Sequence, residues 1–410
     1  MVNLIFWLII AILLFDFLLD RLIDYLNSTK WSKTLPTELK NIYDEEKYQK
    51  SQEYDKVNSN FGIITSSFSF LLIMLMLFLG GFAYFDNLAR SYVENPILVA
   101  LVFFGIIMFL SDILNTPFTI YNIFVIEERF GFNKTTVKTF ILDKLKGGIL
   151  GILIGGGLMS LIIWFYNISG QYFWLYAWAM ISVFMLFMTM FYSNIIVPLF
   201  NKQTPLQEGE LKDEIVKFAE KTGFKLKNIF VIDGSKRSTK ANAYFTGLGA
   251  KKRIVLYDTL INDLTKEEIV AVLAHEIGHY KKKHTLISLI ISFIQTGMTL
   301  YIMSLFLTIP EFSFALGVEN PSFHIGIIAF GVLFSPISMI LGIFMNVISR
   351  KNEYQADKYA KDNYNAEHLI SGLIKLSVKN LSNLTPHSLD VFLNYSHPTL
   401  LQRIKGLRGN

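Results

Sequence analysis

Seven long apolar segments constrain the fold of this chain more than any other feature of its sequence. A helix needs about 20 apolar residues to cross a hydrocarbon core roughly 30 Å thick. With 52% hydrophobic and 17% charged residues over 410 positions, the composition also departs from that of soluble proteins. The chain is therefore predicted to be an α-helical polytopic membrane protein. The predicted spans are Leu4–Leu19, Ile63–Phe85, Ile97–Ile113, Gly148–Tyr166, Phe173–Leu199, Leu286–Ile309 and Ile325–Ile348.

Basic residues fall on alternate connections between these segments. Lysines and arginines are frequent after the first and third segments, in the insert Asn201–Thr285 and after Arg350. They are scarce or absent in the connections Asp86–Pro96, Asn167–Tyr172 and Pro310–Ser322. Since connections rich in Lys and Arg stay in the cytoplasm, the alternation predicts an N-terminus outside the membrane. It also predicts that both soluble portions are cytoplasmic and can meet.

The cysteine count and the charge pattern exclude several kinds of site. The chain has no cysteine, so any metal must be held by nitrogen and oxygen ligands. The net charge is +5, but the basic residues stand in blocks between apolar segments and form no continuous stripe. We therefore expect membrane lipids around the chain and no nucleic acid partner.

Two histidines follow a clear helix start signal. Thr265 and Glu268 have the spacing of a capping box, in which each side chain bonds the backbone amide of the other residue. His275 and His279, further along this helix, then lie on one face, where both imidazoles can reach a single cation. Glu276 is predicted to deprotonate the attacking water. The alternative is that both histidines are polar residues at the membrane surface.

A third ligand is needed, because catalytic zinc usually has three protein ligands and one open position. Glu353 and Asp357 lie four residues apart after the last span, and like charges at this spacing repel unless a cation compensates them. We assign Glu353 as the third ligand and Asp357 as an acceptor that orients one histidine. The alternative is a solvated acidic pair on a helix that also carries Lys351 and Lys358. One Zn²⁺ per chain is expected, with cobalt or manganese left open.

With these residues, the chain resembles the type I CAAX prenyl endopeptidases, which are integral-membrane zinc metalloproteases. The resemblance implies seven transmembrane helices around a water-filled chamber, closed by a cytoplasmic zincin-like α+β metalloprotease domain. The corresponding division is residues 1–200 with five spans, 201–285 and 349–410 as the two parts of the protease domain, and 286–348 as a transmembrane hairpin. Further matching motifs are Glu127-Glu-Arg-Phe-Gly-Phe-Asn-Lys134, Pro198-Leu-Phe-Asn-Lys202, Leu206-Gln-Glu-Gly-Glu-Leu211, Ser235-Lys-Arg-Ser238, Asn242-Ala-Tyr244, Arg253-Ile-Val-Leu-Tyr-Asp258, Ser396-His-Pro398 and Arg403.

The same resemblance implies roles for residues outside the metal motif. His397 is expected to stabilise the oxyanion, and Arg403 is expected to support that site. Asn242 and Ala243 are expected to hold the substrate backbone. The resemblance also implies that polar residues within the spans line the chamber. They are Asp16, Asp112 and Asn115.

One departure from the family pattern bears on the source and the substrate. Lys240-Ala241 stands where many eukaryotic members have His-Ser, which is more similar to the bacterial branch. No retention signal follows Leu407. We therefore expect a bacterial inner membrane, or the endoplasmic reticulum in a eukaryote. Bacteria generally lack protein prenylation, so the peptide or protein substrate is left open as prenylated or not, and the oligomeric state is also open.

The predicted function is hydrolysis of peptide bonds by zinc-activated water, of the CAAX prenyl protease type. A second enzymatic hypothesis is a protease for membrane protein quality control, and a non-enzymatic one is a zinc-stabilised transporter or channel. The segment Arg253–Tyr257 is predicted to be a strand and an edge to which an extended peptide adds. Asn228–Asp233 is predicted to be a second strand, with a turn at Gly247–Gly249. The remaining histidines are left out of the predicted site: His284, His324, His368 and His387.

Overall fold

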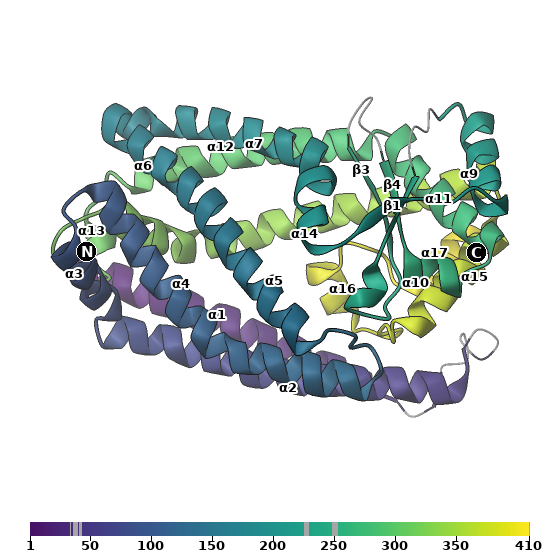
Figure 1. Cartoon of the computed structure of the whole chain (residues 1–410). Helices are drawn as coiled ribbons and strands as arrows, with labels where there is room; N and C mark the ends of the chain where they lie inside the picture. Colours follow the sequence, from purple (N-terminus) through teal and green to yellow (C-terminus); the bar gives the residue numbers. More distant parts are fainter. Residues whose placement is uncertain (33, 36–39, 41–42, 225–228, 248–252, 410) are drawn as a thin grey trace.

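The computed structural model describes the chain except residues 33, 36–39, 41–42, 225–228, 248–252 and 410. Long helices fill the end that carries the N-terminus, and a small sheet with shorter helices forms the end that carries the C-terminus (Figure 1). The helical part contains α1 (Val2–Ser28), α2 (Glu45–Phe78), α3 (Gly81–Tyr92), α4 (Pro96–Tyr121), η2 (Asn122–Glu127), α5 (Val137–Leu150), η3 (Gly151–Gly156), α6 (Gly157–Ser169), η4 (Gly170–Tyr172), α7 (Phe173–Ile195), α12 (His284–Phe306), α13 (Glu311–Phe314) and α14 (Phe323–Asn363).

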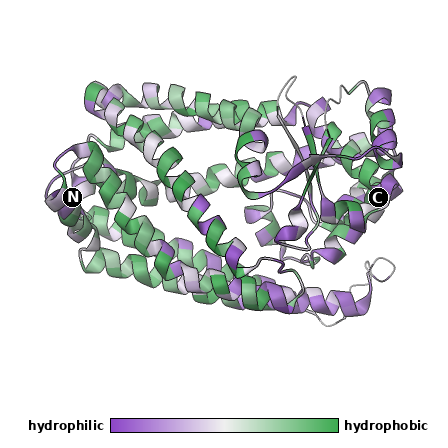
Figure 2. Ribbon diagram, viewed as in Figure 1, coloured by the Kyte–Doolittle hydropathy of each residue, from purple (hydrophilic) through white to green (hydrophobic). Residues whose placement is uncertain are grey.

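Among the described residues, six helices or helical runs are long and apolar enough to cross a membrane. One of these runs, Val137–Phe200, is 64 residues long. It turns at η4, after which α7 packs back on α6, and the rings of Phe165 and Tyr176 stack with centroids 5.6 Å apart. This run therefore holds two of the seven predicted segments. Apolar residues predominate over most of the long helices, whereas the start of α2, next to the sheet end of the molecule, is hydrophilic (Figure 2).

The second predicted span ends earlier than expected. The predicted segment Ile63–Phe85 stops at Phe78, because Gly80 has a left-handed backbone with φ of 66° and a new helix, α3, begins after it. Glycine adopts this conformation without the penalty of a side chain. Residues beyond Gly80 therefore belong to a separate short helix and not to the span.

The largest packed clusters among the long helices lie near the end away from the sheet. Two apolar clusters lie there, one around Ile9 and Phe103 and one around Ile163 and Phe173. Over the most apolar window of each helical run, at most 17% of the residues are buried. This open arrangement fits helices around a chamber, as the resemblance implied.

Two of the polar residues predicted within the spans have partners on neighbouring helices. Asp16 on α1 accepts a hydrogen bond from Ser335 on α14 at 2.8 Å. Asp112 on α4 lies 2.8 Å from the ammonium group of Lys144 on α5. Asn115, one turn after Asp112, bonds within its own helix to the carbonyl oxygen of Ser111. Paired polar groups of this kind reduce the cost of placing charge within a membrane.

The soluble part is built around one four-stranded sheet with strand order β1-β2-β4-β3. β2 and β4 are parallel, and both outer pairs are antiparallel. Its elements are α8 (Val197–Phe200), β1 (Gln203–Pro205), α9 (Glu210–Lys221), β2 (Ile229–Ile232), η5 (Gly234–Lys236), β3 (Ala243–Thr246), β4 (Arg253–Tyr257), α10 (Asp258–Asp263), α11 (Lys266–Lys281), α15 (Ala366–Lys379), α16 (Ser388–Asn394) and α17 (Leu400–Arg408).

Both predicted strands are present as β2 and β4, although Asn228 and most of the predicted turn at Gly247–Gly249 lie outside the described residues. The prediction that Arg253–Tyr257 is an edge is wrong. β4 lies between β2 and β3, and its central residues Ile254, Val255 and Leu256 are buried. Such an uninterrupted apolar run is typical of an interior strand. The edge on this side of the sheet is β3.

One helix joins the two parts. α14 is 41 residues long and continues across the predicted boundary between the transmembrane hairpin and the C-terminal part of the protease domain. α11 packs against α14, with Gly278 at the contact. α14 therefore carries residues of the last span directly into the soluble part, where Glu353 and Asp357 are buried.

Candidate metal centre

The helix that carries the two histidines begins as predicted. The Thr265 hydroxyl accepts a hydrogen bond from the Glu268 amide at 3.3 Å, and the Glu268 carboxylate accepts one from the Thr265 amide at 2.8 Å. The same carboxylate also accepts from Ser371 at 2.6 Å and from Lys375 at 2.8 Å, both on α15. The capping box therefore starts α11 and also fixes it to a neighbouring helix.

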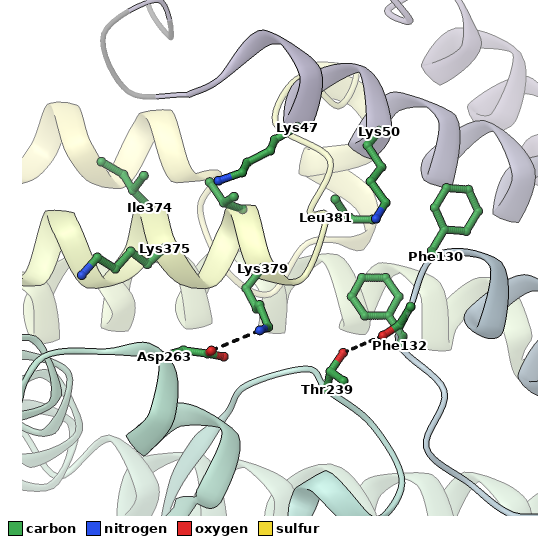
Figure 3. A pocket seen from close by; sticks show the side chains of 12 residues that line it. Lys47, Lys50, Phe130, Phe132, Thr239, Asp263, Ile374, Lys375, Lys379 and Leu381 are labelled. Carbon is green, nitrogen blue, oxygen red and sulfur yellow. Dashed lines mark hydrogen bonds and ion pairs between the residues drawn. The ribbon is translucent and has the colours of Figure 1, made fainter.

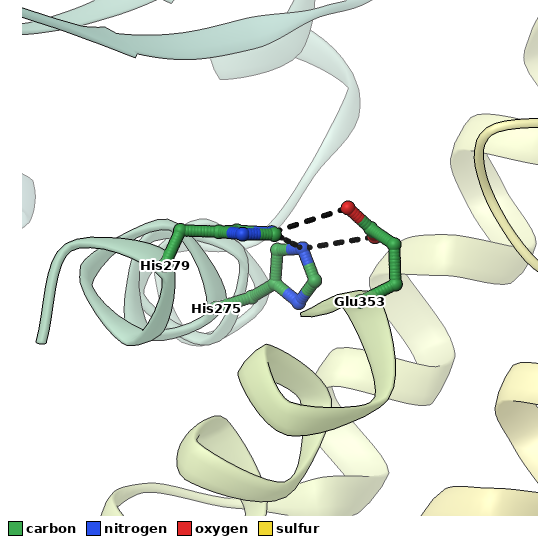
Figure 4. Close-up of side chains that lie close together, drawn as sticks. All are labelled: His275, His279 and Glu353. Atoms are coloured by element: carbon green, nitrogen blue, oxygen red, sulfur yellow. Dashed lines mark hydrogen bonds and ion pairs between the residues drawn. The ribbon is translucent and has the colours of Figure 1, made fainter. Parts of the chain in front are cut away.

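Three side chains from α11 and α14 converge on one point (Figure 4). The Nε2 atoms of His275 and His279 lie 3.1 Å apart. Glu353 faces both imidazoles, with its Oε1 atom 3.2 Å from His279 Nε2 and its Oε2 atom 3.4 Å from His275 Nε2. One donor atom from each residue lies within 4.8 Å of the others. Two imidazoles and a carboxylate form a common ligand set of catalytic zinc.

The surroundings of the Glu353 carboxylate also fit a bound metal ion. Within the described residues, the Oε2 atom of Glu353 is buried and accepts no hydrogen bond. Burial raises the pKa of this carboxyl, but the imidazoles of His275 and His279 outweigh burial and hold the pKa below its usual range. A buried, ionised carboxylate needs a compensating positive charge, which a metal ion held between Glu353 and the two imidazoles would supply.

Asp357, which is buried, and Arg403, which is partly buried, form an ion pair behind His275. The Oδ1 atom of Asp357 lies 2.8 Å from His275 Nδ1. Arg403, on α17, donates to both oxygens of Asp357, at 2.9 and 2.5 Å. Arg403 was expected to support the oxyanion site, and in the structure its guanidinium contacts Asp357 and lies 3.3 Å from His275 Nδ1. It therefore contacts both His275 and the carboxylate that faces this histidine.

The surroundings of His275 favour the protonated form of its imidazole when no metal is bound. Burial and the nearby Arg403 lower its pKa, but the carboxylates of Asp357 and Glu353 that face its ring outweigh them and raise the pKa to about 9. A metal ion that binds Nε2 competes with a proton there. Metal affinity is therefore expected to fall as the pH is lowered.

The predicted site residues lie around one pocket of about 310 Å³. All of them line it except Asp357, which lies behind His275. The Nε2 atom of His397, which is largely exposed, is 3.4 Å from Glu353 Oε1. The lining residues predicted from the sequence are Asn242, Ala243, His275, Glu276, His279, Glu353, His397 and Arg403.

A larger pocket, of about 580 Å³, lies elsewhere, between α2 and α15 (Figure 3). Lys47 and Lys50 from α2 face it together with Lys379, which lies 3.1 Å from Asp263. None of the predicted site residues lines this pocket. The smaller pocket is therefore the candidate active site, because the groups that could carry out hydrolysis gather there.

Three residues near the centre were not predicted from the sequence: His284, Gln355 and Asn380. His284 was left out, yet its Nδ1 atom lies 3.0 Å from His279 Nδ1, and its Nε2 atom lies 3.1 Å from Gln355 Oε1. Asn380 lines the pocket and bonds the backbone of Ala241 in both directions, at 3.2 and 3.3 Å. The only signal in the sequence for His284 was its position five residues after the second histidine.

Long apolar helices joined to a domain with this donor set and a neighbouring glutamate define an integral-membrane metallopeptidase. Two family descriptions match the chain: "CAAX prenyl protease N-terminal, five membrane helices" over residues 24–202 and "Peptidase family M48" over residues 205–410. The chain belongs to peptidase family M48, among the CAAX prenyl proteases. It is a membrane zinc metalloendopeptidase of that type, which confirms the predicted enzyme class and the prediction of a helical membrane protein that carries a metalloprotease domain.

Similar proteins cover nearly the whole chain. The CAAX prenyl protease 1 homolog of Arabidopsis thaliana is 37% identical over 388 residues, which are 92% of this chain and 91% of the relative. CAAX prenyl protease 1 of Saccharomyces cerevisiae is 36% identical over 96% of this chain and 92% of its own length. The crystal structure of S. mikatae Ste24p matches with a TM-score of 0.93 and 35% identity, over 98% of both chains.

Proposed function

We propose that the chain cleaves peptide bonds of a protein substrate with one Zn²⁺ held by His275, His279 and Glu353. The convergence of these three side chains, within 4.8 Å, is the observation that carries the proposal. When bound there, zinc would polarise the scissile carbonyl and lower the pKa of water. The remaining steps fall to side chains of the chain itself.

Glu276 acts as the general base and then the general acid. It lines the same pocket as the ligands and is only partly buried, so its carboxylate is accessible to water in the pocket. It takes a proton from the attacking water and passes it to the leaving amine. His397 donates a hydrogen bond to the developing oxyanion, a contribution of about 3 kcal/mol in other hydrolases. Its ring lies on the carboxylate side of the centre, 3.4 Å from Glu353.

The substrate backbone adds along the edge strand β3, which starts at Ala243. Asn242 is exposed at the start of this strand, and its side chain accepts a hydrogen bond from the Ala243 amide at 2.8 Å. The backbone of Ala241, just before it, is held by Asn380. An edge held in this way can pair with an extended peptide through main-chain hydrogen bonds.

The substrate class follows from the family. The relatives named above are CAAX prenyl proteases, so we include C-terminal CAAX peptides, prenylated or not, in the proposal. The alternation of basic residues supports a cytoplasmic protease domain and an external N-terminus. Lys240-Ala241 favours the bacterial branch and its inner membrane.

Cleavage of matched peptides tests this function. The purified chain is given prenylated and unprenylated CAAX peptides, and the products are identified by mass spectrometry, beside Glu276→Ala. The wild-type chain should release C-terminal fragments, and Glu276→Ala should keep its zinc and lose cleavage. Cleavage of unprenylated peptides irrespective of their C-terminal sequence would favour the quality-control hypothesis. Wild-type rates in Glu276→Ala would show that Glu276 is not the base.

A further inference from the structure

The outward-facing nitrogen of His279 has a buried histidine as its neighbour. The rings of His279 and His284 meet edge to face, with centroids 5.1 Å apart and an interplanar angle of 74°. Their Nδ1 atoms are 3.0 Å apart, which is a hydrogen-bond distance. On the other side of His284, its Nε2 atom lies 3.1 Å from the Oε1 atom of Gln355 on α14.

A strained turn holds His284 in this place. α11 ends at Lys281 and α12 begins at His284, so only two residues connect the helices. The second of these, Lys283, has a left-handed backbone with φ of 60° and ψ of 24°. A residue with a side chain is uncommon in this region and costs free energy there. The turn brings His284 back against His279, and the contacts of the folded protein maintain it.

The positions of the protons on the two rings determine which histidine donates the hydrogen bond between the Nδ1 atoms. His279 Nε2 belongs to the ligand group, so it must be free of a proton when a metal binds. A neutral imidazole then carries its proton on Nδ1, which can only donate to Nδ1 of His284. His284 must accept there, and so it carries its own proton on Nε2 and donates it to Gln355 Oε1.

The two ligand histidines therefore have different outer partners. His275 Nδ1 faces the carboxylate of Asp357 at 2.8 Å, whereas His279 Nδ1 faces an imidazole. We propose that His284 is a positioning residue, which fixes the tautomer and orientation of His279, and that Gln355 in turn fixes His284. This inference rests on the proposed zinc site. Outer partners of metal-bound histidines typically change metal affinity about 10- to 100-fold.

The substitutions must distinguish a lost hydrogen bond from a lost side chain. His284 also lines a polar pocket of about 200 Å³ with Glu276 and Ser288, so an alanine there could admit a water that replaces the acceptor. His284→Phe fills the space without an acceptor. His284→Asn keeps an oxygen near the position of Nδ1. Gln355→Leu removes the acceptor oxygen. Gln355→Glu keeps an oxygen there, and its carboxylate can accept a hydrogen bond but cannot donate one.

The full-length chain is purified, and its affinity for zinc is measured by competition with a chelator. The absorption spectrum of the cobalt-loaded protein reports separately on ligand orientation. His284→Phe and Gln355→Leu should both lower the affinity for zinc. In His284→Phe the affinity should fall about 10- to 100-fold, and the absorption bands of the cobalt-loaded protein should shift. His284→Asn and Gln355→Glu should stay close to the wild-type value. The control is His324→Asn, at a buried histidine that pairs with Asp86 at 2.7 Å on the far side of the helical part.

Each other outcome overturns the proposal in a distinct way. Unchanged zinc affinity and cobalt bands in His284→Phe would show that His284 does not position His279. An equal loss of zinc affinity in His284→Asn and His284→Phe would mean that the side chain of His284 matters only for packing. An equal loss of zinc affinity in Gln355→Glu and Gln355→Leu would mean that Gln355 donates the hydrogen bond to His284 instead of accepting it. If the wild-type chain itself binds no zinc, the proposed function fails together with this inference.

Discussion

Gly278 lies directly against Ala356, where α11 meets α14. A Cβ atom on Gly278 would come within 3.1 Å of both Cα and the carbonyl oxygen of Ala356. This distance is shorter than nine in ten real Cβ contacts, and backbone atoms cannot swing away as a flexible side chain can. The glycine inside the two-histidine motif therefore permits the close approach that brings Glu353, less than one turn before Ala356, to the imidazoles.

Substitution of Gly278 should separate the two helices. We expect Gly278→Ala to push α14 away, to lower stability by about 1–3 kcal/mol and to reduce zinc affinity. Gly372→Ala on α15 is the matched control, because a Cβ there meets its nearest neighbours at ordinary distances of 3.6 Å or more. Thermal unfolding and zinc content measure both effects. Full zinc content in a stable Gly278→Ala protein would show that this contact does not position Glu353.

The charge on Asp357 should matter more than its shape. Asp357→Asn keeps the size of the side chain but loses the negative charge that faces His275 and Arg403. The partly buried guanidinium of Arg403 would then lie beside His275 with less compensation of its charge, and zinc affinity should fall about 10- to 100-fold. Chelator competition measures this change. An affinity equal to that of the wild-type chain would mean that Asp357 does not act through His275.

Acid should destabilise the start of α11 through Glu268. Burial raises the pKa of this carboxyl, but Lys375, Ser371 and the amide of Thr265 outweigh burial and lower the pKa below its ordinary value. The stability that it contributes is therefore present above its unfolded pKa of about 4.3 and is lost as the pH falls through the lower folded pKa.

Without the Glu268 carboxylate, the stability of the protein should depend less on pH in the acid range. Glu268→Gln should unfold at a lower temperature at neutral pH and lose less further stability between about pH 5 and pH 3 than the wild-type chain. Glu220→Gln, at an exposed position on α9, is the control. Thermal unfolding over a pH series gives the comparison. Parallel curves for Glu268→Gln and the wild-type chain would exclude this role.

Arg237 connects the sheet domain to the membrane helices. Its guanidinium donates to both oxygens of Asp143 on α5, at 2.7 and 2.8 Å, and to the carbonyl oxygen of Phe200 at 2.9 Å. Arg237→Lys keeps the charge but cannot make this forked set of bonds. We expect a lower unfolding temperature with unchanged zinc content in the folded protein. A loss of zinc at full stability would instead place Arg237 in the metal centre.

Local patterns in the sequence were sufficient for the parts of the site that lie on one helix. The capping box at Thr265 and the spacing of His275 and His279 depend on contacts within one or two turns, and the structure contains both. Glu353 could be assigned because catalytic zinc needs a third ligand and the chain has no cysteine.

Contacts that depend on a turn or on strand order were not predictable in this way. His284 reaches His279 only because Lys283 adopts a left-handed conformation, for which a lysine gives no signal. β4 has the composition of any short strand, and its interior position depends on the pairing of β3 with it. Both features are set by tertiary packing and not by local preference.

The most direct test of the central claim is the position of the metal in the wild-type chain. Anomalous X-ray scattering measured on either side of the zinc absorption edge locates zinc without reference to activity. One zinc peak per chain is expected, in contact with His275 Nε2, His279 Nε2 and the Glu353 carboxylate. A zinc peak elsewhere, or none in protein that still cleaves peptides, would contradict the account.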